Sequence, residues 1–203
     1  MIMGGVHPAP QDAVPSACET LLLIGPAQTG FWEHASVAPE FDDARPDPLD
    51  RWSKRVLSSV AGPAGAIAIF PSDGPPYPPF IAWALRSGAF WASPVGMLVH
   101  GQAGLLASMR GALALPYAVP LPDTGQSPCL SCKDRPCVAA CPVDALHSDR
   151  YDTEKCHNHL DTAAGSDCMS QGCAARRACP VSRAYGRRPE QSAFHMRAFH
   201  RTL

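Results

Sequence analysis

The sequence predicts an α+β protein in which a small N-terminal α/β layer domain, residues 1–124, precedes a cysteine-rich C-terminal module, residues 125–203. Eight of the nine cysteines lie in the second segment, whereas the first contains only Cys18. The proline-rich residues 115–128 lie where the composition changes, as is typical of a domain boundary. With 46% apolar and 17% charged residues, the chain has enough core-forming material for one or two globular domains.

In the first segment, short apolar runs alternate with amphipathic stretches, which is the pattern of strands and helices packed in layers. The predicted strands are residues 20–25, 66–70 and 95–100, and the predicted helices are residues 47–60 and 78–89. Asp47 is a suitable N-cap for the first helix, because Pro48 follows it at the first helical position.

No feature near the N-terminus predicts export or membrane insertion. The first basic residue is Arg45, and the longest early apolar stretch, residues 21–24, is too short for a signal sequence or a membrane span. We therefore expect a cytoplasmic protein without a membrane partner. The formal net charge of -1 provides no general attraction to nucleic acid.

The spacing of the cysteines indicates metal chemistry, because densely spaced cysteines in a reducing compartment rarely form disulfides. The pattern is Cys129-x2-Cys132-x4-Cys137-x3-Cys141-Pro142, then Cys156, then Cys168-x4-Cys173-x5-Cys179-Pro180. Eight thiolates match two 4Fe-4S clusters with four ligands each, and in two-cluster ferredoxins the cysteine before proline ligates the other cluster. The sequence therefore predicts a ferredoxin-like module with two clusters.

The predicted ligand sets follow from this crossed arrangement. One set is Cys129, Cys132, Cys137 and Cys179, and the other is Cys141, Cys156, Cys168 and Cys173. A helix over residues 138–146 is expected to direct Cys141 toward the second set, and residues 188–201 predict a closing helix.

The same cysteines are also compatible with zinc in place of iron–sulfur clusters, because Cys-x2-Cys occurs in structural zinc sites. Only one such pair is present, and the x3-Cys-Pro ending favours iron–sulfur clusters. The loops are longer than the common ferredoxin spacing, so the cluster type stays open. His157 and His159, beside Cys156, are expected to be exposed loop residues that are not ligands.

A group of cations accompanies the second cysteine run, namely Arg176, Arg177, Arg183, Arg187 and Arg188. Each oxidised cluster with four thiolates carries a charge of about -2, so nearby cations are expected to stabilise the reduced state. The same cations also suit an acidic redox partner or a phosphate-bearing substrate, and an ordinary solvated basic face is the simplest alternative.

The four-one-three cysteine arrangement with its two Cys-Pro endings resembles the double 4Fe-4S module of epoxyqueuosine reductases, a family of cobalamin-dependent tRNA-modifying enzymes. Residues 93–100 and 104–111 are similar to the stretch that precedes the clusters in that family, and residues 72–76 lie where it has an aspartate followed by a proline. The resemblance implies Asp73 as the catalytic proton donor, cobalamin as a cofactor and a tRNA or small-molecule substrate. From the residues alone, Asp73 is typical of a turn-forming aspartate.

From these features we expect an iron–sulfur electron-transfer protein that passes electrons to a redox partner protein or to a ligand of its N-terminal domain. Two alternatives stay open. One is a corrinoid-dependent reductase that resembles epoxyqueuosine reductase, and the other is a zinc-stabilised interaction module.

Overall fold

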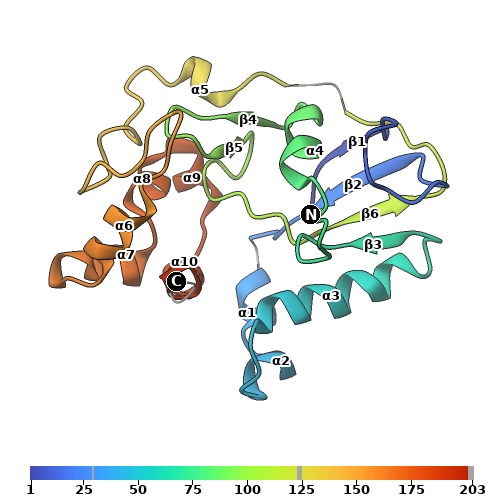
Figure 1. The fold of residues 1–203 in the computed structure, drawn as a ribbon, viewed down its shortest axis with the longest axis horizontal. Helices are drawn as coiled ribbons and strands as arrows, with labels where there is room; N and C mark the ends of the chain where they lie inside the picture. The colour runs from blue at the N-terminus through green and yellow to red at the C-terminus, as the bar shows by residue number, and fades with distance from the viewer. Residues whose placement is uncertain (29, 123–124, 201–203) are drawn as a thin grey trace. The chain divides into compact units, whose positions relative to one another are not determined.

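A computed structural model describes residues 1–28, 30–122 and 125–200. Helices and antiparallel sheets together form an α+β fold (Figure 1). The chain divides into two compact units: unit 1 comprises residues 1–90 and 108–125, and unit 2 comprises residues 91–107 and 126–203. Residues 91–107, which precede the expected boundary at residues 124 and 125, thus belong to the cysteine-rich unit, and residue 124 itself lies outside the described residues.

Unit 1 is built on a four-stranded sheet with the order β1-β2-β6-β3. Its strands are β1 (Ile2–Val6), β2 (Thr20–Ile24), β3 (Ile67–Ile69) and β6 (Gly111–Leu115). Every pairing in it is antiparallel, so the unit is not a parallel α/β layer. The strands predicted at residues 20–25 and 66–70 are confirmed, with slightly shorter bounds.

Strand β6 lies in the interior of this sheet, between β2 and β3, and all five of its residues are buried. It pairs with β2 from Thr20 opposite Leu115 to Ile24 opposite Gly111. Gly111 is required by close packing, because a Cβ atom there would lie 2.6 Å from a methyl carbon of Leu57 on helix α3 (Pro48–Ala61). Small residues therefore allow this helix to approach the sheet closely.

The described part of unit 1 also contains the helices α1 (Phe31–Ala35), α2 (Pro39–Asp42), α3 (Pro48–Ala61) and α4 (Phe80–Arg86). Helix α3 confirms the prediction for residues 47–60, and α4 is shorter than the predicted residues 78–89. Asp47 does precede α3, but it has a left-handed backbone conformation and its side chain makes no capping hydrogen bond. Asp47 is thus the N-cap residue that the sequence predicts, followed by Pro48, but its side chain does not act as the cap.

Unit 2 combines a two-stranded sheet with short helices. The strands are β4 (Phe90–Ala92) and β5 (Leu98–His100), so the strand predicted at residues 95–100 is present but shorter. The helices are α5 (Pro128–Ser131), α6 (Thr153–Leu160), α7 (Ser166–Gln171), α8 (Ala174–Ala178), α9 (Pro180–Tyr185) and α10 (Pro189–His200), with a 3-10 turn at Ala163–Gly165. Helix α10, which packs on α7, confirms the closing helix, although residue 201 lies outside the described residues.

The helix predicted over residues 138–146 is wrong, because this stretch consists of turns and loop. Pro142 has no N–H to donate to a helical hydrogen bond. Asp144 has a φ angle of 49°, which is incompatible with a right-handed helix. Apolar periodicity alone did not reveal either obstacle.

A cluster of buried apolar residues forms a hydrophobic core in unit 2. Its buried apolar members are Val95, Val99, Leu105, Leu146 and Ala175, and the cysteines Cys137 and Cys179 belong to the same cluster. Gly104 and Ser182 tie one side of this core together: the Leu105 N–H donates to Ser182 Oγ at 2.9 Å. Gly104 has a φ angle of 57°, and a Cβ atom there would lie 2.5 Å from the Ser182 backbone nitrogen, so glycine is required.

Among the residues that the model describes, no helix is both long enough and apolar enough to cross a membrane.

Candidate metal centre

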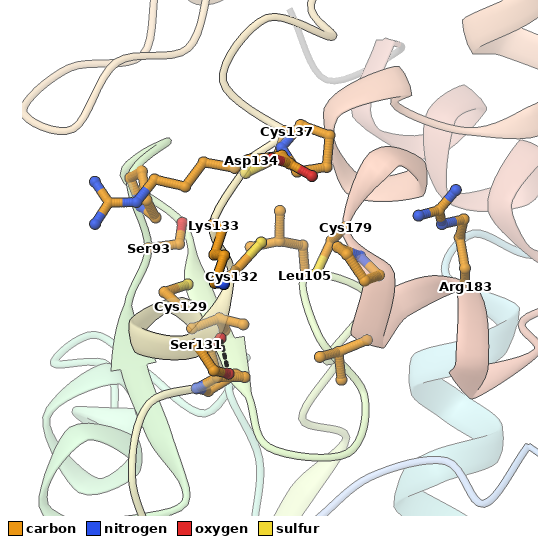
Figure 2. A pocket seen from close by; sticks show the side chains of 17 residues that line it. Ser93, Leu105, Cys129, Ser131, Cys132, Lys133, Asp134, Cys137, Cys179 and Arg183 are labelled. Carbon is orange, nitrogen blue, oxygen red and sulfur yellow. Dashed lines mark hydrogen bonds between the residues drawn. The ribbon is translucent and has the colours of Figure 1, made fainter.

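The first predicted ligand set lies around one cavity of unit 2. Helix α5 carries Cys129 and is followed directly by Cys132, Cys137 lies in a turn, and Cys179 immediately precedes α9. All four cysteines line a cavity of about 550 Å³ whose walls include Val99 and Leu105 (Figure 2). Residues that are far apart in the sequence therefore meet at one place.

Local structure explains how these side chains are held. Ser127 caps α5 by accepting a hydrogen bond from the Cys129 N–H at 3.3 Å. Pro180 occupies the first position of α9, and proline is tolerated there because an N–H at that position makes no hydrogen bond within the helix. Pro128-Cys129 and Cys179-Pro180 thus lie at the start of short helices, whereas Cys137 and Cys141 lie in turns and loop.

The thiols of this set raise one another's pKa values through their charges. Burial raises the pKa of Cys137 most, and the neighbouring Cys179 and Cys129 thiols raise it further. Burial likewise raises the pKa of Cys129, against a hydrogen bond to Ser127 that lowers it. A free thiolate is therefore disfavoured here, and a bound cation would reverse this because it stabilises the thiolate form.

The second predicted set is gathered mainly by α6, α7 and α8. Cys156 lies on α6, Cys168 on α7, Cys173 at the N-terminus of α8, and Cys141 in a loop where it accepts the Ala145 N–H at 3.3 Å. Burial raises the pKa of Cys156, and charges on Cys173, Cys141 and Cys168 raise it further. These four residues are neighbours, as the sequence assignment requires, and their ligand role stays a prediction.

Both sets pack against the same hydrophobic core. Cys137 and Cys179 of the first set are part of it, each with 7% of its surface exposed. Cys129 of the first set and Cys141 and Cys173 of the second pack against it from the side. Both sets therefore share an apolar wall, while Cys129, Cys132, Cys141, Cys156 and Cys173 stay partly exposed.

Tyr151 is a neighbour of the second set that the sequence did not indicate. Burial raises the pKa of its phenol, and so does a hydrogen bond to Cys156. Its ring stacks on Phe199 of α10 with the centroids 6.0 Å apart. The phenol O–H is thus held by packing where it donates to a predicted ligand sulfur.

The thiols are gathered, but they do not converge on a single point. Within residues 1–28, 30–122 and 125–200, no group of three or more His, Cys, Asp or Glu side chains is arranged to hold a metal ion. The donor chemistry nevertheless fits an iron–sulfur cluster, because both sets consist only of cysteine sulfur and contain no carboxylate or imidazole. The cavity beside the first set provides the room that a cluster needs, whereas a single zinc ion needs far less.

The arginines after Cys173 do not form one free basic face. Arg176 donates to the Leu105 carbonyl oxygen at 3.1 Å. Arg177 donates to the Gly172 carbonyl at 3.0 Å and forms an ion pair with Asp167. Two of the five cations therefore stabilise the fold of unit 2.

Other cations surround the first cysteine set instead. Arg183 lines the cavity together with Lys133 and Arg135, while Asp134 is the one acidic residue among the described lining side chains (Figure 2). Lys133 and Arg135 were not recognised from the sequence as part of the basic group. Lys133 and Arg135 lie between Cys132 and Cys137 in the sequence, and this position is the signal by which they could have been assigned to the site.

His157 and His159 both lie on helix α6, the second partly exposed, so the prediction of two exposed loop residues is wrong. His157 has 8% of its surface exposed, stacks on Phe199, and its Nδ1 lies 2.9 Å from His200 Nδ1. His200 in turn contacts Asp161 at 2.9 Å. This chain of contacts fastens α10 to α6 beside the second cysteine set.

Asp73 has the local structural role that its residue type predicts. Its Oδ2 accepts the Phe70 N–H at 2.8 Å and its Oδ1 accepts a hydrogen bond from Lys54 Nζ at 3.1 Å. It belongs to unit 1, whereas all eight predicted ligands belong to unit 2. Both oxygens are therefore engaged in fixing the loop after β3.

The fold and the site together describe an α+β chain with a cysteine-lined cavity in its second unit. No protein-family model matches this chain, and no curated protein or solved structure is significantly similar to it.

Proposed function

We propose that this chain is a cytoplasmic iron–sulfur electron-transfer protein whose C-terminal module, residues 125–203, holds two 4Fe-4S clusters. The observation that carries the proposal is that Cys129, Cys132, Cys137 and Cys179 line one cavity despite their separation in the sequence. Eight cysteines in two sets of four neighbours have the composition that two such clusters require.

Each part of the proposed site has a distinct task. When bound, a 4Fe-4S cluster supplies a one-electron redox centre. The eight cysteines hold the clusters, and Val99 and Leu105 exclude water from the first site. Lys133, Arg135 and Arg183 place positive charge beside it, which favours the reduced and more negative state and the approach of an acidic redox partner.

The experiment that tests this proposal is chemical analysis of protein purified without oxygen, with visible spectra before and after dithionite. We expect brown protein with about eight irons and eight sulfides per chain that bleaches on reduction. Colourless protein with about two zinc ions and no redox change would replace the proposal with a zinc-stabilised interaction module.

The proposal does not extend to a corrinoid-dependent reductase. The residue that the family resemblance implies as its proton donor, Asp73, uses both carboxylate oxygens within its own loop and toward Lys54. Addition of cobalamin to the anaerobic protein checks this separately: retention on gel filtration with a changed corrinoid spectrum would restore the reductase.

A further inference from the structure

A groove on the surface of unit 2 adjoins the first cysteine set. It has a volume of about 760 Å³. Cys129, Ser93 and Arg135 line both this groove and the cavity of the first set (Figure 2). A predicted ligand of the first cluster is therefore part of the wall that the two spaces share, and a molecule in the groove would contact that ligand directly.

The groove is lined largely by apolar side chains, several of which are exposed. Leu130 is 76% exposed and Val138 is 46% exposed, and Trp91 adds an aromatic ring to the lining. Leu130 follows Cys129 on α5, and consecutive residues of a helix do not face the same way, so the turn that brings Cys129 to the cavity directs Leu130 outward. Exposed apolar groups that gather at one place with a polar rim mark interaction sites.

The charge around the groove is positive. Arg135 is the one charged side chain in its described lining. Lys133, Asp134 and Arg183 line the adjoining cavity, and all four of these residues are exposed. In the part of the chain that the structure describes, no ion pair joins any of the three cations to an acidic side chain. The surface beside Cys129 thus carries cations whose charge the fold does not neutralise.

We propose that this groove is the docking surface for an acidic one-electron carrier protein, which exchanges electrons with the first cluster beside Cys129. The inference rests on the function proposed above. Leu130 and Val138 form the apolar centre of the contact, and Arg135 and Lys133 at its rim attract the acidic carrier.

A single electron crosses in each encounter. When the carrier arrives reduced, its redox centre loses one electron and the first cluster gains it, and no covalent bond forms or breaks. When the cluster is the reduced partner, the electron moves the other way. Complexes of electron-transfer proteins have small interfaces, so a single groove is sufficient for such a contact.

An acidic protein suits this surface better than a nucleic acid or a second copy of the chain. Interfaces with nucleic acid are more polar and much more positively charged than those between proteins, whereas this groove has an apolar centre and one cation in its described lining. In a symmetric dimer the same patch would meet itself, so Arg135 and Lys133 would face like charges.

The test uses the full chain purified without oxygen and an acidic plant-type 2Fe-2S ferredoxin as the carrier. Binding is measured by calorimetry at low and high salt, and electron exchange in either direction is followed by visible absorbance. We expect saturable binding that weakens as salt screens the charges, together with one-electron exchange.

Iron and sulfide analysis of the same sample separates two kinds of failure. Protein with about eight irons that does not bind the ferredoxin, or binds it without electron exchange, would overturn this inference and leave the proposed function intact. Protein without iron would overturn both.

Two variants with matched controls locate the contact. Leu130→Ser removes exposed apolar surface and Arg135→Gln removes the cation of the groove, both at exposed positions. We expect each to weaken ferredoxin binding about fivefold or more while the iron content is unchanged. The controls are Val37→Ser, at a position in unit 1 that is 74% exposed, and the exposed Arg45→Gln. Parental binding by either groove variant, or equal loss in the controls, would refute the surface.

The other two occupants give distinct results with the same variants. Binding of a single-stranded RNA oligonucleotide that is lost in Arg135→Gln but kept in Leu130→Ser, without ferredoxin binding, would make the groove a site for a phosphate backbone. Dimerisation on gel filtration that Leu130→Ser abolishes would assign the groove to a second copy. Either result would overturn the proposed carrier.

Discussion

Cys179 and Cys129 face the same cavity in unit 2, close enough that a negative charge on Cys179 raises the pKa of Cys129, although burial is the larger cause. Cys179 is the last cysteine of the second run and Cys129 the first of the first run. Folding therefore places Cys179, from the second run, beside cysteines of the first run. The same arrangement occurs in two-cluster ferredoxins, where the cysteine before a proline ligates the other cluster.

Single cysteine variants test the two sets. We expect Cys179→Ala and Cys173→Ala each to lower iron from about eight to about four per chain, because each removes one ligand from a different cluster. Cys18→Ala is the matched control, since Cys18 lies in unit 1 and donates to the Thr20 carbonyl. Iron and sulfide are measured after anaerobic purification, and full iron retention in Cys179→Ala would remove Cys179 from the ligand set.

Tyr151→Phe tests the hydrogen bond to Cys156. The variant keeps the ring that stacks on Phe199 but loses the O–H donor, so electron density at the sulfur rises and the potential of one cluster falls. We expect a decrease on the order of tens of millivolts, measured by redox titration with electron paramagnetic resonance. Tyr77→Phe, at an exposed position in unit 1, is the control, and equal potentials in all three proteins would contradict the prediction.

Ser182→Ala tests the link between Gly104 and α9. Ser182 is 1% exposed, and its loss leaves the buried Leu105 N–H without an acceptor. We expect the free energy of unfolding to fall by about 1–3 kcal/mol, measured by urea denaturation. The exposed Ser170→Ala should change it by less than about 0.5 kcal/mol. Parental stability of Ser182→Ala would mean that the hydrogen bond contributes nothing to the fold.

Asp12→Ala tests an ion pair in unit 1 that joins a covered carboxylate to a partly exposed Arg86. Asp12 accepts hydrogen bonds from the Ala9 N–H, from Trp83 Nε1 and from Arg86, and only 3% of its side chain is exposed. Burial raises the pKa of Asp12, but the hydrogen bonds together outweigh it, led by that from Arg86, so that the pKa lies below its usual value. We expect the variant to lose about 1–3 kcal/mol of stability at pH 7.

The sign of the pH dependence follows from the lowered pKa. Stabilisation by ionised Asp12 is fully present above the pKa of about 3.9 for an unfolded aspartate, and it is lost as the pH falls through the lower folded pKa. The stability difference between the parent and Asp12→Ala should therefore shrink below about pH 4. The exposed Glu19→Ala variant is the control, and a difference that grows in acid would contradict this assignment.

Elements with strong local signals were predictable from the sequence. Helix α3 has apolar residues at helical spacing after a proline, and β2 is a short, continuous apolar run. Strands β1 and β6 were missed because they consist largely of glycine, alanine and other residues without strong strand preference. Their conformation is stabilised by pairing with β2, and local sequence patterns do not reveal this pairing.

The sequence by itself determined the pattern on which the proposed metal chemistry rests: two cysteine runs, each closed by Cys-Pro, and Cys156 between them supply eight candidate ligands. The spacing of cysteines is a property of the sequence, so it can be recognised without a structure. Only the tertiary structure decided which groups surround those thiols, such as Tyr151 beside Cys156, and which arginines are used by the fold, such as Arg176 at the Leu105 carbonyl. The surroundings of these side chains depend on contacts between segments that are distant in the sequence. Such contacts form, and contribute free energy, only when the whole chain packs.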